Sequence, residues 1–251
     1  MEHYATAQQV FVAGMVFARV GGLIMVMPGL GDTPTPVQLR MAFAMLMCLV
    51  VAPVVAPTLP QTPPDLGGLI GDMIREILIG LAIGAILRTF MAAMAIAGEV
   101  ISIATTLSFA QTANPMAGLQ NTTLSTFLSL LAMVLVMVTG LHHLFIAAMV
   151  RSYALFPYGH TAPVGDFAQL AIRTASETFA LGVQLSAPVL VFSLVFNIAT
   201  GLVGRAMPQF QIYFAAAPLQ VLLGLSLFAL SLGVMGTYWL DRYRDVLMTF
   251  G

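Results

Sequence analysis

The chain consists mostly of apolar runs, each close to the length that a helix needs to cross a lipid bilayer. A hydrocarbon core of about 30 Å is crossed by roughly 20 residues of α-helix. Most breaks between the runs are rich in Pro or Gly, which end helices, and no stretch alternates as a strand does. The pattern predicts an all-α, multi-span membrane protein with these runs: Val10–Met27, Met41–Ala56, Leu69–Leu87, Thr89–Ala110, Leu124–Val150, Phe179–Val203 and Phe210–Leu240.

Charged residues are too scarce to cover a soluble globular domain. They make up 8% of this chain, whereas soluble proteins average roughly 25%. We therefore expect much of the surface to meet membrane lipid or other apolar protein. The net charge of −1 argues against nucleic acid as a partner. Because no linker or repeat of fixed period stands out, residues 1–251 are expected to form a single integral-membrane domain.

Several apolar runs nevertheless contain charged side chains or proline. Arg19, Arg88 and Glu99 lie inside such runs, and a charge at the bilayer centre costs at least about 2.5–3.5 kcal/mol. Pro218 lies inside the last run, where it removes one backbone hydrogen bond and should kink the helix. We therefore expect kinked, tilted helix hairpins that pack against protein partners.

A charged segment opens the third run. Asp72, Arg75 and Glu76 are three or four residues apart and so share a helix face. Gly80 and Gly84 then form a GxxxG pattern, which lets another backbone approach closely. Two interpretations stay open: a solvated helix start with chance glycines, or a polar inter-subunit contact beside a close-packed helix pair. Under the second, Gly→Leu should block assembly, whereas Gly→Ala should be mild.

Glu99 and two adjacent histidines are the polar groups that could carry chemistry. Glu99 is either a proton relay or the partner of an Arg or amide across an interface. His142 and His143 are neighbours in sequence, so they point to different sides of a helix and make a poor metal pair. The sequence has no HExxH, GxSxG or P-loop motif. We therefore predict no enzymatic activity, no metal and no cofactor.

The segment from Ser108 to Gln120 carries no charge, although it separates two apolar runs. Irregular backbone at membrane depth survives only inside protein or beside a water-filled cavity. The segment is either an ordinary surface turn or a plug that folds back and closes a pore. The residues predicted to form such a plug are Ser108, Phe109, Asn114, Pro115, Met116, Gly118 and Gln120.

Near the C-terminus, Arg205 precedes a break at Pro208 and Gln209, and Pro218 and Gly224 follow in the next run. In physical terms this is a helix–turn–helix hairpin whose first helix ends on a favourable positive charge. The order and spacing of these residues resemble the signature of the FliR family of flagellar biosynthesis proteins, which has relatives in virulence type III secretion. The resemblance extends over essentially the whole chain through Arg19…Pro28…Pro36…Arg40, Glu76…Gly80…Gly84, Ala97-Gly98, Ser108-Phe109-Ala110, Asn114-Pro115…Gly118…Gln120, Gly140…His142-His143 and Ala187-Pro188.

The resemblance implies a subunit of the flagellar type III export gate in the bacterial inner membrane, at the flagellar basal body. It implies FliP-like, FliQ-like and FlhB-like partner subunits, a tilted helical funnel raised partly out of the bilayer, and unfolded export substrates that pass through the channel. The segment Ser108–Gln120 then corresponds to the family's plug. The positions expected to make inter-subunit packing and polar contacts are Arg75, Glu76, Gly80, Gly84, Glu99, Arg205, Pro208 and Gln209.

A secondary transporter and an intramembrane enzyme are the alternatives to an export-gate subunit. A secondary transporter of a small solute calls for internal repeats and paired broken helices at the midplane, and no convincing repeat is visible. An intramembrane enzyme requires a nucleophile–base pair or a metal set, and none can be named. Stability when purified alone would favour the transporter, whereas co-purification with other small membrane proteins would favour the gate subunit.

Overall fold

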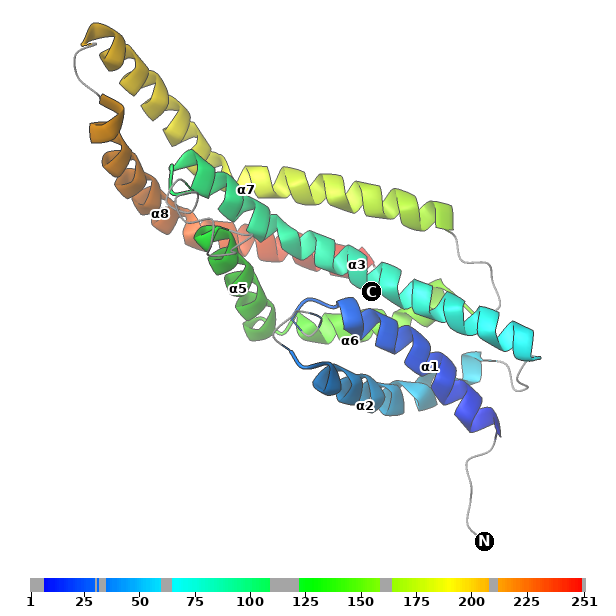
Figure 1. Cartoon of the computed structure of the whole chain (residues 1–251). Helices are drawn as coiled ribbons and strands as arrows, with labels where there is room; N and C mark the ends of the chain where they lie inside the picture. The colour runs from blue at the N-terminus through cyan, green and yellow to red at the C-terminus, as the bar shows by residue number, and fades with distance from the viewer. Residues whose placement is uncertain are drawn as a thin grey trace. The chain divides into compact units, whose positions relative to one another are not determined.

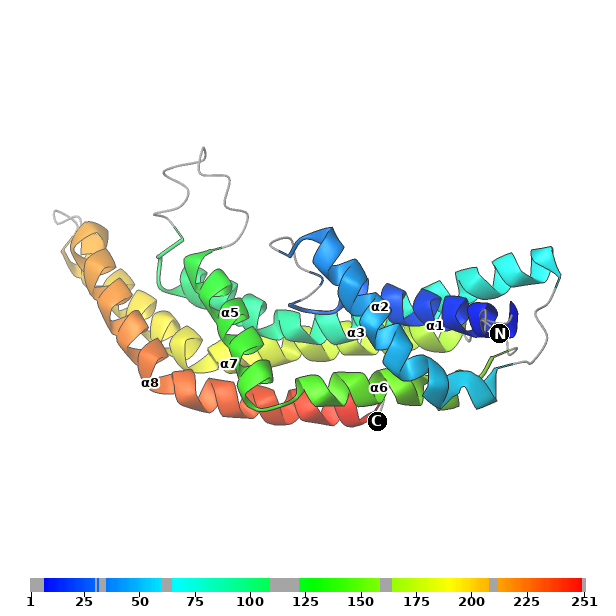
Figure 2. The same cartoon turned by 90° about the horizontal axis from the view of Figure 1, so that it is seen from below.

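The computed structural model describes residues 7–29, 31, 35–59, 65–108, 122–158, 164–207 and 212–249. Within them the chain forms helices and turns, which confirms the all-α class (Figures 1 and 2). The elements are α1 (Ala7–Val26), α2 (Val37–Val55), the short 3-10 helix η1 (Ala56–Thr58), α3 (Leu66–Ala104), α5 (Thr123–Val138), α6 (His142–Leu155), α7 (Val164–Ala206) and α8 (Ile212–Thr249).

Two of the expected runs are one helix, and one expected run is two helices. The predicted break between Leu87 and Thr89 is wrong, because α3 continues through Arg88 for 39 residues. Neither Pro nor Gly lies at that point, so nothing in the backbone ends the helix there. The run Leu124–Val150 instead breaks between α5 and α6, where Gly140 adopts a φ of +73° that an L side chain rarely takes.

Five of the described helices are long and apolar enough to cross a membrane, or six if α5 and α6 count as one broken span. The described residues therefore do not form the seven separate spans that hydropathy predicted. Helices α3, α7 and α8 have 39, 43 and 38 residues, about twice the roughly 20 that a single crossing needs. Pro188 lies inside α7, and α8 continues through Pro218 without a break.

The chain divides into two compact units. The first contains Met1–Phe90, Thr139–Ala175 and Arg244–Gly251, and the second contains Met91–Val138 and Ser176–Tyr243. Three long helices, α3, α7 and α8, contribute residues to both. The expectation of a single domain over residues 1–251 stays a prediction.

In the first unit, α1 packs along α2 and against the N-terminal half of α3, and α2 also touches α6 (Figure 2). Its core contains Val16 and Ile24 of α1 together with Ile83 and Leu87 of α3, all fully buried. By contrast, α2 exposes apolar side chains along most of its length, including Met45 and Leu49. Such a face suits contact with lipid or with another apolar protein surface.

In the second unit, the end of α3 packs with α5, α7 and α8. Leu128 of α5 and Val189 of α7 are fully buried, as is Ile101 of α3. Phe127 of α5 meets Phe228 of α8 edge to face, with ring centroids 6.3 Å apart. The C-terminal part of α7 and the N-terminal part of α8 lie side by side as the hairpin that the sequence predicted (Figures 1 and 2).

Candidate functional site

A buried ion pair between α1 and α3 forms the polar centre of the first unit. The guanidinium of Arg19 donates two hydrogen bonds to the carboxylate of Glu76, one of them 2.9 Å long, and both side chains are about 1% exposed or less. A buried charge needs such a partner, because leaving water is costly for either ion alone. The pair therefore ties α1 to α3 inside an otherwise apolar core.

Arg19 also binds the end of α6. It donates to the backbone carbonyls of Ser152 and Phe156, each at 2.9 Å, and its guanidinium lies 4.0 Å from the centre of the Tyr153 ring. The Ser152 carbonyl also accepts the backbone N–H of Phe156, and carbonyls at this end of a helix carry the negative end of its dipole. One cation therefore holds α1, α3 and α6 together.

A second polar group lies one turn before Glu76, on the face that the sequence predicted. Asp72 and Arg75 form an ion pair at 3.8 Å, and the hydroxyl of Tyr158 donates to the carboxylate of Asp72. Burial, followed by this hydrogen bond, raises the pKa of Tyr158 well above its usual value. Phe11 of α1 meets the Tyr158 ring edge to face, so this group also joins α1 to α3.

Gly80 and Gly84 allow α1 and α3 to touch through their backbones. A Cβ at Gly80 would lie 2.1 Å from the carbonyl oxygen of Arg19, and one at Gly84 would lie 2.9 Å from that of Leu23. The close approach that the GxxxG pattern predicted thus lies within this chain at these two positions. We therefore expect alanine at Gly80 to be harmful rather than mild, because its Cβ would overlap backbone atoms of α1.

In the second unit, Glu99 of α3 caps the start of α5. Its carboxylate accepts a hydrogen bond of 2.8 Å from the backbone N–H of Thr122, the residue before α5, and the Thr122 hydroxyl accepts one from the N–H of Ser125. Gly98 makes this possible, since a Cβ there would lie 2.4 Å from the Cα of Ser125. The structure thus gives Glu99 a hydrogen-bond partner within this chain, the backbone amide of Thr122. The proton relay and the pairing across an interface both stay predictions.

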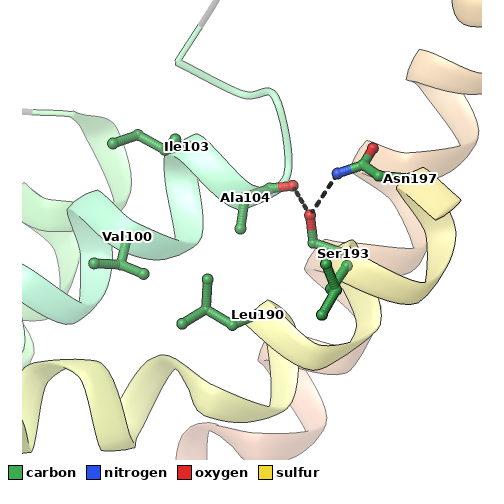
Figure 3. Close-up of a pocket in the computed structure, with 7 residues that line it drawn as sticks. Val100, Ile103, Ala104, Leu190, Ser193 and Asn197 are labelled. Carbon is green, nitrogen blue, oxygen red and sulfur yellow. Dashed lines mark hydrogen bonds between the residues drawn. The ribbon is translucent and has the colours of Figure 1, made fainter.

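The C-terminal end of α3 is held by two other helices. The carbonyl oxygen of Ala104 accepts hydrogen bonds from the Ser193 hydroxyl of α7 at 2.7 Å and from the Gln220 amide of α8 at 2.9 Å. The Ser193 hydroxyl also accepts a bond of 3.3 Å from the amide of Asn197 (Figure 3). Ser193 and Gln220 are each 5% exposed, so these bonds form out of contact with water.

Beyond Ala104 the chain leaves the helix through an unusual conformation. Thr106 has a φ of +61°, in the left-handed region that β-branched residues rarely occupy. Such conformations cost on the order of 1–3 kcal/mol and persist where the surroundings hold them. Thr105 and Ser108 continue the turn through hydrogen bonds back to Ile101 and Ser102. The chain therefore leaves α3 through a hydrogen-bonded turn in which the backbone of Thr106 is strained.

A cavity of about 300 Å³ opens beside this end, between α3 and α7. Figure 3 shows its wall, in which the Ser193 hydroxyl and Ala104 carbonyl already bind each other. The remaining lining is mostly aliphatic, so the cavity suits an apolar group better than a polar substrate. Its lining residues are Val100, Ile103, Ala104, Leu190, Ser193, Leu194 and Asn197.

The two anchors, Glu99 with Thr122 and Ala104 with Ser193 and Gln220, lie on either side of the predicted plug. Of the predicted plug residues the structure describes Ser108, which follows the strained turn. The others lie outside the described residues, as do two of the predicted contact positions: Phe109, Asn114, Pro115, Met116, Gly118, Gln120, Pro208 and Gln209. Arg205 lies exposed in the last turn of α7, where its charge complements the helix dipole as expected.

Sequence reasoning named Glu99 but not its partner, and it missed the functions of Ser193 and Gln220. A signal was available for Gln220, because it lies between Pro218 and Gly224 in the stretch that carried the family resemblance. Gln220 and Gly224 are four residues apart, so they share one face of α8. That face meets α3, since a Cβ at Gly224 would lie 2.4 Å from the methyl group of Thr105.

The arrangement holds helix ends in place. In the described part of the chain, no group of three or more His, Cys, Asp or Glu side chains could hold a metal ion. The buried carboxylate, Glu76, is fully engaged by Arg19.

Comparison with known proteins agrees with the resemblance seen in the sequence. The family model described as bacterial export proteins, family 1, matches residues 10–246. The flagellar biosynthetic protein FliR of Caulobacter vibrioides is 57% identical over 250 residues, which cover 100% of both chains. FliR of Escherichia coli K12 is 29% identical over 229 residues, covering 91% of this chain and 87% of its own length. FliR of Bacillus subtilis is 25% identical over 210 residues, covering 82% and 80%. The chain therefore belongs to family 1 of the bacterial export proteins, the family of the flagellar biosynthetic protein FliR.

Proposed function

We propose that this protein is a subunit of the flagellar type III export gate in the bacterial inner membrane, and that it forms part of the channel through which unfolded flagellar proteins pass. Membership of the export family and the full-length similarity to proteins named for flagellar biosynthesis support this proposal. In it the protein has no catalytic step and needs no cofactor. It packs against the other subunits, lines part of the export channel and closes that channel.

The helices support a role within a larger assembly. α3, α7 and α8 are about twice as long as one crossing requires, which suits a funnel that extends past the bilayer. α2 and the C-terminal half of α7 expose apolar side chains that FliP-like, FliQ-like and FlhB-like subunits or lipid would cover. We keep Arg75, Arg205, Pro208 and Gln209 as proposed contacts with those subunits.

The anchors on α3 are the observation that carries the proposed plug. Glu99 binds Thr122, which lies two residues after the segment, and Ala104 is held four residues before it. About 7.5 Å of helix axis separates these two α3 residues, at 1.5 Å per residue. Loops whose ends lie close together tolerate change without disturbing the elements they connect, and they are frequently functional. These contacts do not involve the segment itself, which supports a plug rather than a structural hinge.

The test is to delete Asn114–Gly118 from a chain that is co-expressed with its FliP-like and FliQ-like partners. We expect the partners to co-purify as before, and membranes that contain the complex to leak ions and small solutes. A deletion between η1 and α3, Gln61–Pro64, is the matched control for loss of residues between two helices. Intact assembly without added leak would contradict the plug, whereas loss of assembly would favour the hinge.

A second measurement addresses the gate assignment itself. A gate subunit should be unstable or aggregated when it is expressed alone and should be rescued by its partner subunits. A secondary transporter should instead be a stable, monodisperse protein in detergent without them. A heat-stable monomer would therefore count against the gate and for the transporter.

A further inference from the structure

We propose that the cavity between α3 and α7 holds one acyl chain of an anionic phospholipid, whose phosphate binds Arg205 at the end of α7. The inference goes beyond the proposed function, because it depends only on α7 lying in a membrane, and α7 is long and apolar enough to cross one. The cavity and Arg205 both belong to the second unit.

The first observation is that the cavity opens at the surface of this unit between apolar side chains. Ile103 of α3 and Leu194 of α7 line the cavity and are 66% and 62% exposed. Val100 and Leu190 lie on its opposite walls (Figure 3). Its volume of about 300 Å³ is at the lower end of the range for ligand pockets. Within the hydrocarbon of a bilayer, an acyl chain is the apolar group at hand to fill such an opening.

The polar groups in the cavity wall already bind one another. The hydroxyl of Ser193 donates to the Ala104 carbonyl and accepts the side-chain amide of Asn197. An occupant therefore needs to supply no hydrogen bond. A polar substrate or a segment of peptide backbone would instead leave its own polar groups unpaired there, which is unfavourable away from water. The wall thus favours an acyl chain.

An exposed stripe on α7 connects the cavity to Arg205. Residues three or four apart lie on one face of a helix, and this spacing runs through Leu194, Ile198, Gly201 and Arg205, all of them exposed. A Cβ at Gly201 would meet nothing within 4 Å. In the described part of the chain, the surface between the cavity and Arg205 is therefore apolar and unobstructed.

Arg205 supplies a cation where the phosphate of a lipid would lie. No charged residue lies between Glu177 and Arg205, so Arg205 marks the end of the apolar part of α7. Among the residues that the structure describes, Arg205 has no ion-pair partner. A long arginine side chain near a helix end extends to the level of the lipid headgroups, and its planar guanidinium can donate two hydrogen bonds to a phosphate.

The distance along α7 matches the depth of an acyl chain in the bilayer. About 16 Å of helix axis separates Leu194 from Arg205, at 1.5 Å per residue. Half of a hydrocarbon core of about 30 Å is roughly 15 Å. A phospholipid with its phosphate at Arg205 therefore places an acyl chain beside the cavity, near the middle of the bilayer.

Arg205 is also one of the contacts proposed above with partner subunits. A phosphate has several acceptor oxygens, so a lipid bound to Arg205 can accept a second donor from a neighbouring subunit. The bound lipid and the subunit contact are therefore compatible, and the lipid is best tested in the assembled complex.

The experiment places the protein, assembled with its partner subunits, in lipid nanodiscs. Separate samples contain traces of phosphatidylglycerol or phosphatidylcholine with a photoreactive diazirine in the acyl chain, and labelled residues are mapped after illumination. We expect phosphatidylglycerol to label Ile103 and Leu194 about fivefold more than phosphatidylcholine does, because one cation near the membrane surface favours an anionic lipid by about that factor. Exposed Leu230 and Val234 of α8 report contact with bulk lipid, and both lipids should label them equally.

Two exposed positions of α7 can be changed without disturbing the core. Arg205→Gln should lower phosphatidylglycerol labelling of the cavity to the level of phosphatidylcholine. Gly201→Leu should lower labelling by both lipids several-fold, because its side chain obstructs the stripe. The matched controls are Arg244→Gln and Gly233→Leu on α8, where the arginine is exposed and a Cβ at the glycine would meet nothing within 4 Å. Neither control should alter labelling of the cavity.

Three results would overturn the lipid site. The first is the same ratio of labelling by the two lipids at the cavity and at the α8 reference positions, which would show contact with bulk lipid only. The second is no lipid labelling of the cavity in the assembled complex, because a partner subunit then covers the opening. The third is a loss of labelling in the controls that equals the loss in Arg205→Gln or Gly201→Leu.

Co-purification of the partner subunits tests the proposed function separately. If the partners do not co-purify, the gate assignment is wrong, and labelling of the purified chain still decides the lipid site. If they co-purify and the cavity is not labelled, the lipid site is wrong and the gate assignment stands.

Discussion

The carboxylate of Glu99 in α3 accepts the backbone N–H of Thr122 at 2.8 Å and so caps α5 from a neighbouring helix. In a capping box the same task falls to a Glu or Gln within the first turn of the capped helix, but here that position is Ser125. The contact fixes the start of α5 relative to α3 inside the second unit. It gives a glutamate inside an apolar run a backbone partner in the same chain.

Glu99→Gln should therefore be tolerated, and Glu99→Leu should not. The Gln oxygen still accepts the hydrogen bond, and the change loses only the favourable interaction of a charge with the helix dipole. The Leu variant leaves the Thr122 N–H without its partner and should cost about 1 kcal/mol, as lost caps do. Hydrogen exchange in the first turn of α5 measures the effect. Loss of export in a fully assembled Glu99→Gln complex would instead favour the proton relay.

Breaking the Arg19–Glu76 pair should destabilise the first unit strongly. Arg19→Met or Glu76→Gln leaves one buried charge without its partner, which costs about 3–5 kcal/mol. The double change Arg19→Met with Glu76→Met should cost less than either, although the carbonyls of Ser152 and Phe156 still lose the guanidinium of Arg19. The melting temperature of the protein in detergent measures this, with exposed Arg205→Met as control. Equal stability of the single variants and the parent would show that the pair contributes nothing.

Three glycines of α3 should respond to alanine in a fixed order. Gly80→Ala should be the most harmful, because its Cβ would lie 2.1 Å from the Arg19 carbonyl oxygen, and overpacking of this kind costs about 1–3 kcal/mol or more. Gly84→Ala meets backbone at 2.9 Å and should cost less. Gly71 has nothing within 4 Å, so Gly71→Ala should stabilise the helix by up to about 1 kcal/mol. Thermal unfolding of the three variants tests the order, and a harmless Gly80→Ala would contradict the α1–α3 contact.

Thr106→Gly should stabilise the end of α3. Glycine adopts a φ of +61° without the steric cost that threonine bears there. Because glycine also makes the unfolded chain more flexible, we expect a net gain of at most about 1 kcal/mol. Slower hydrogen exchange at residues 105–108 would report it. The same change at Thr126, inside α5, is the control and should destabilise, since glycine weakens a helix interior.

The helices could largely be predicted from the chain, and the errors have identifiable causes. The expected runs end at Leu87 and begin again at Thr89, yet neither Pro nor Gly lies there and α3 continues. The break at Gly140 lay inside an expected run, since a single glycine does not announce a positive φ. Hydropathy averages the polarity of neighbouring residues along the chain, whereas a helix ends where its backbone hydrogen bonds end.

The candidate site could be predicted only in part. The pair Gly98-Glu99 was visible as a small residue beside a charge in an apolar run, but its partner lies 23 residues away, beyond the uncharged segment. Ser193 gave no signal at all, because a serine in an apolar helix usually bonds to its own backbone. The residues of the predicted plug were chosen by composition, and that prediction remains to be tested.

The amino-acid sequence by itself determined that this is an all-α membrane protein of the export family. The length of the apolar runs and the scarcity of charge leave few alternatives, because a bilayer admits only backbones that satisfy their own hydrogen bonds. Only the tertiary structure decided which polar groups meet. Arg19 and Glu76 are 57 residues apart, and Ala104 and Gln220 are 116 apart. Such pairs form because close helix packing excludes water and lipid from both partners, and that packing depends on distant residues that no local pattern contains.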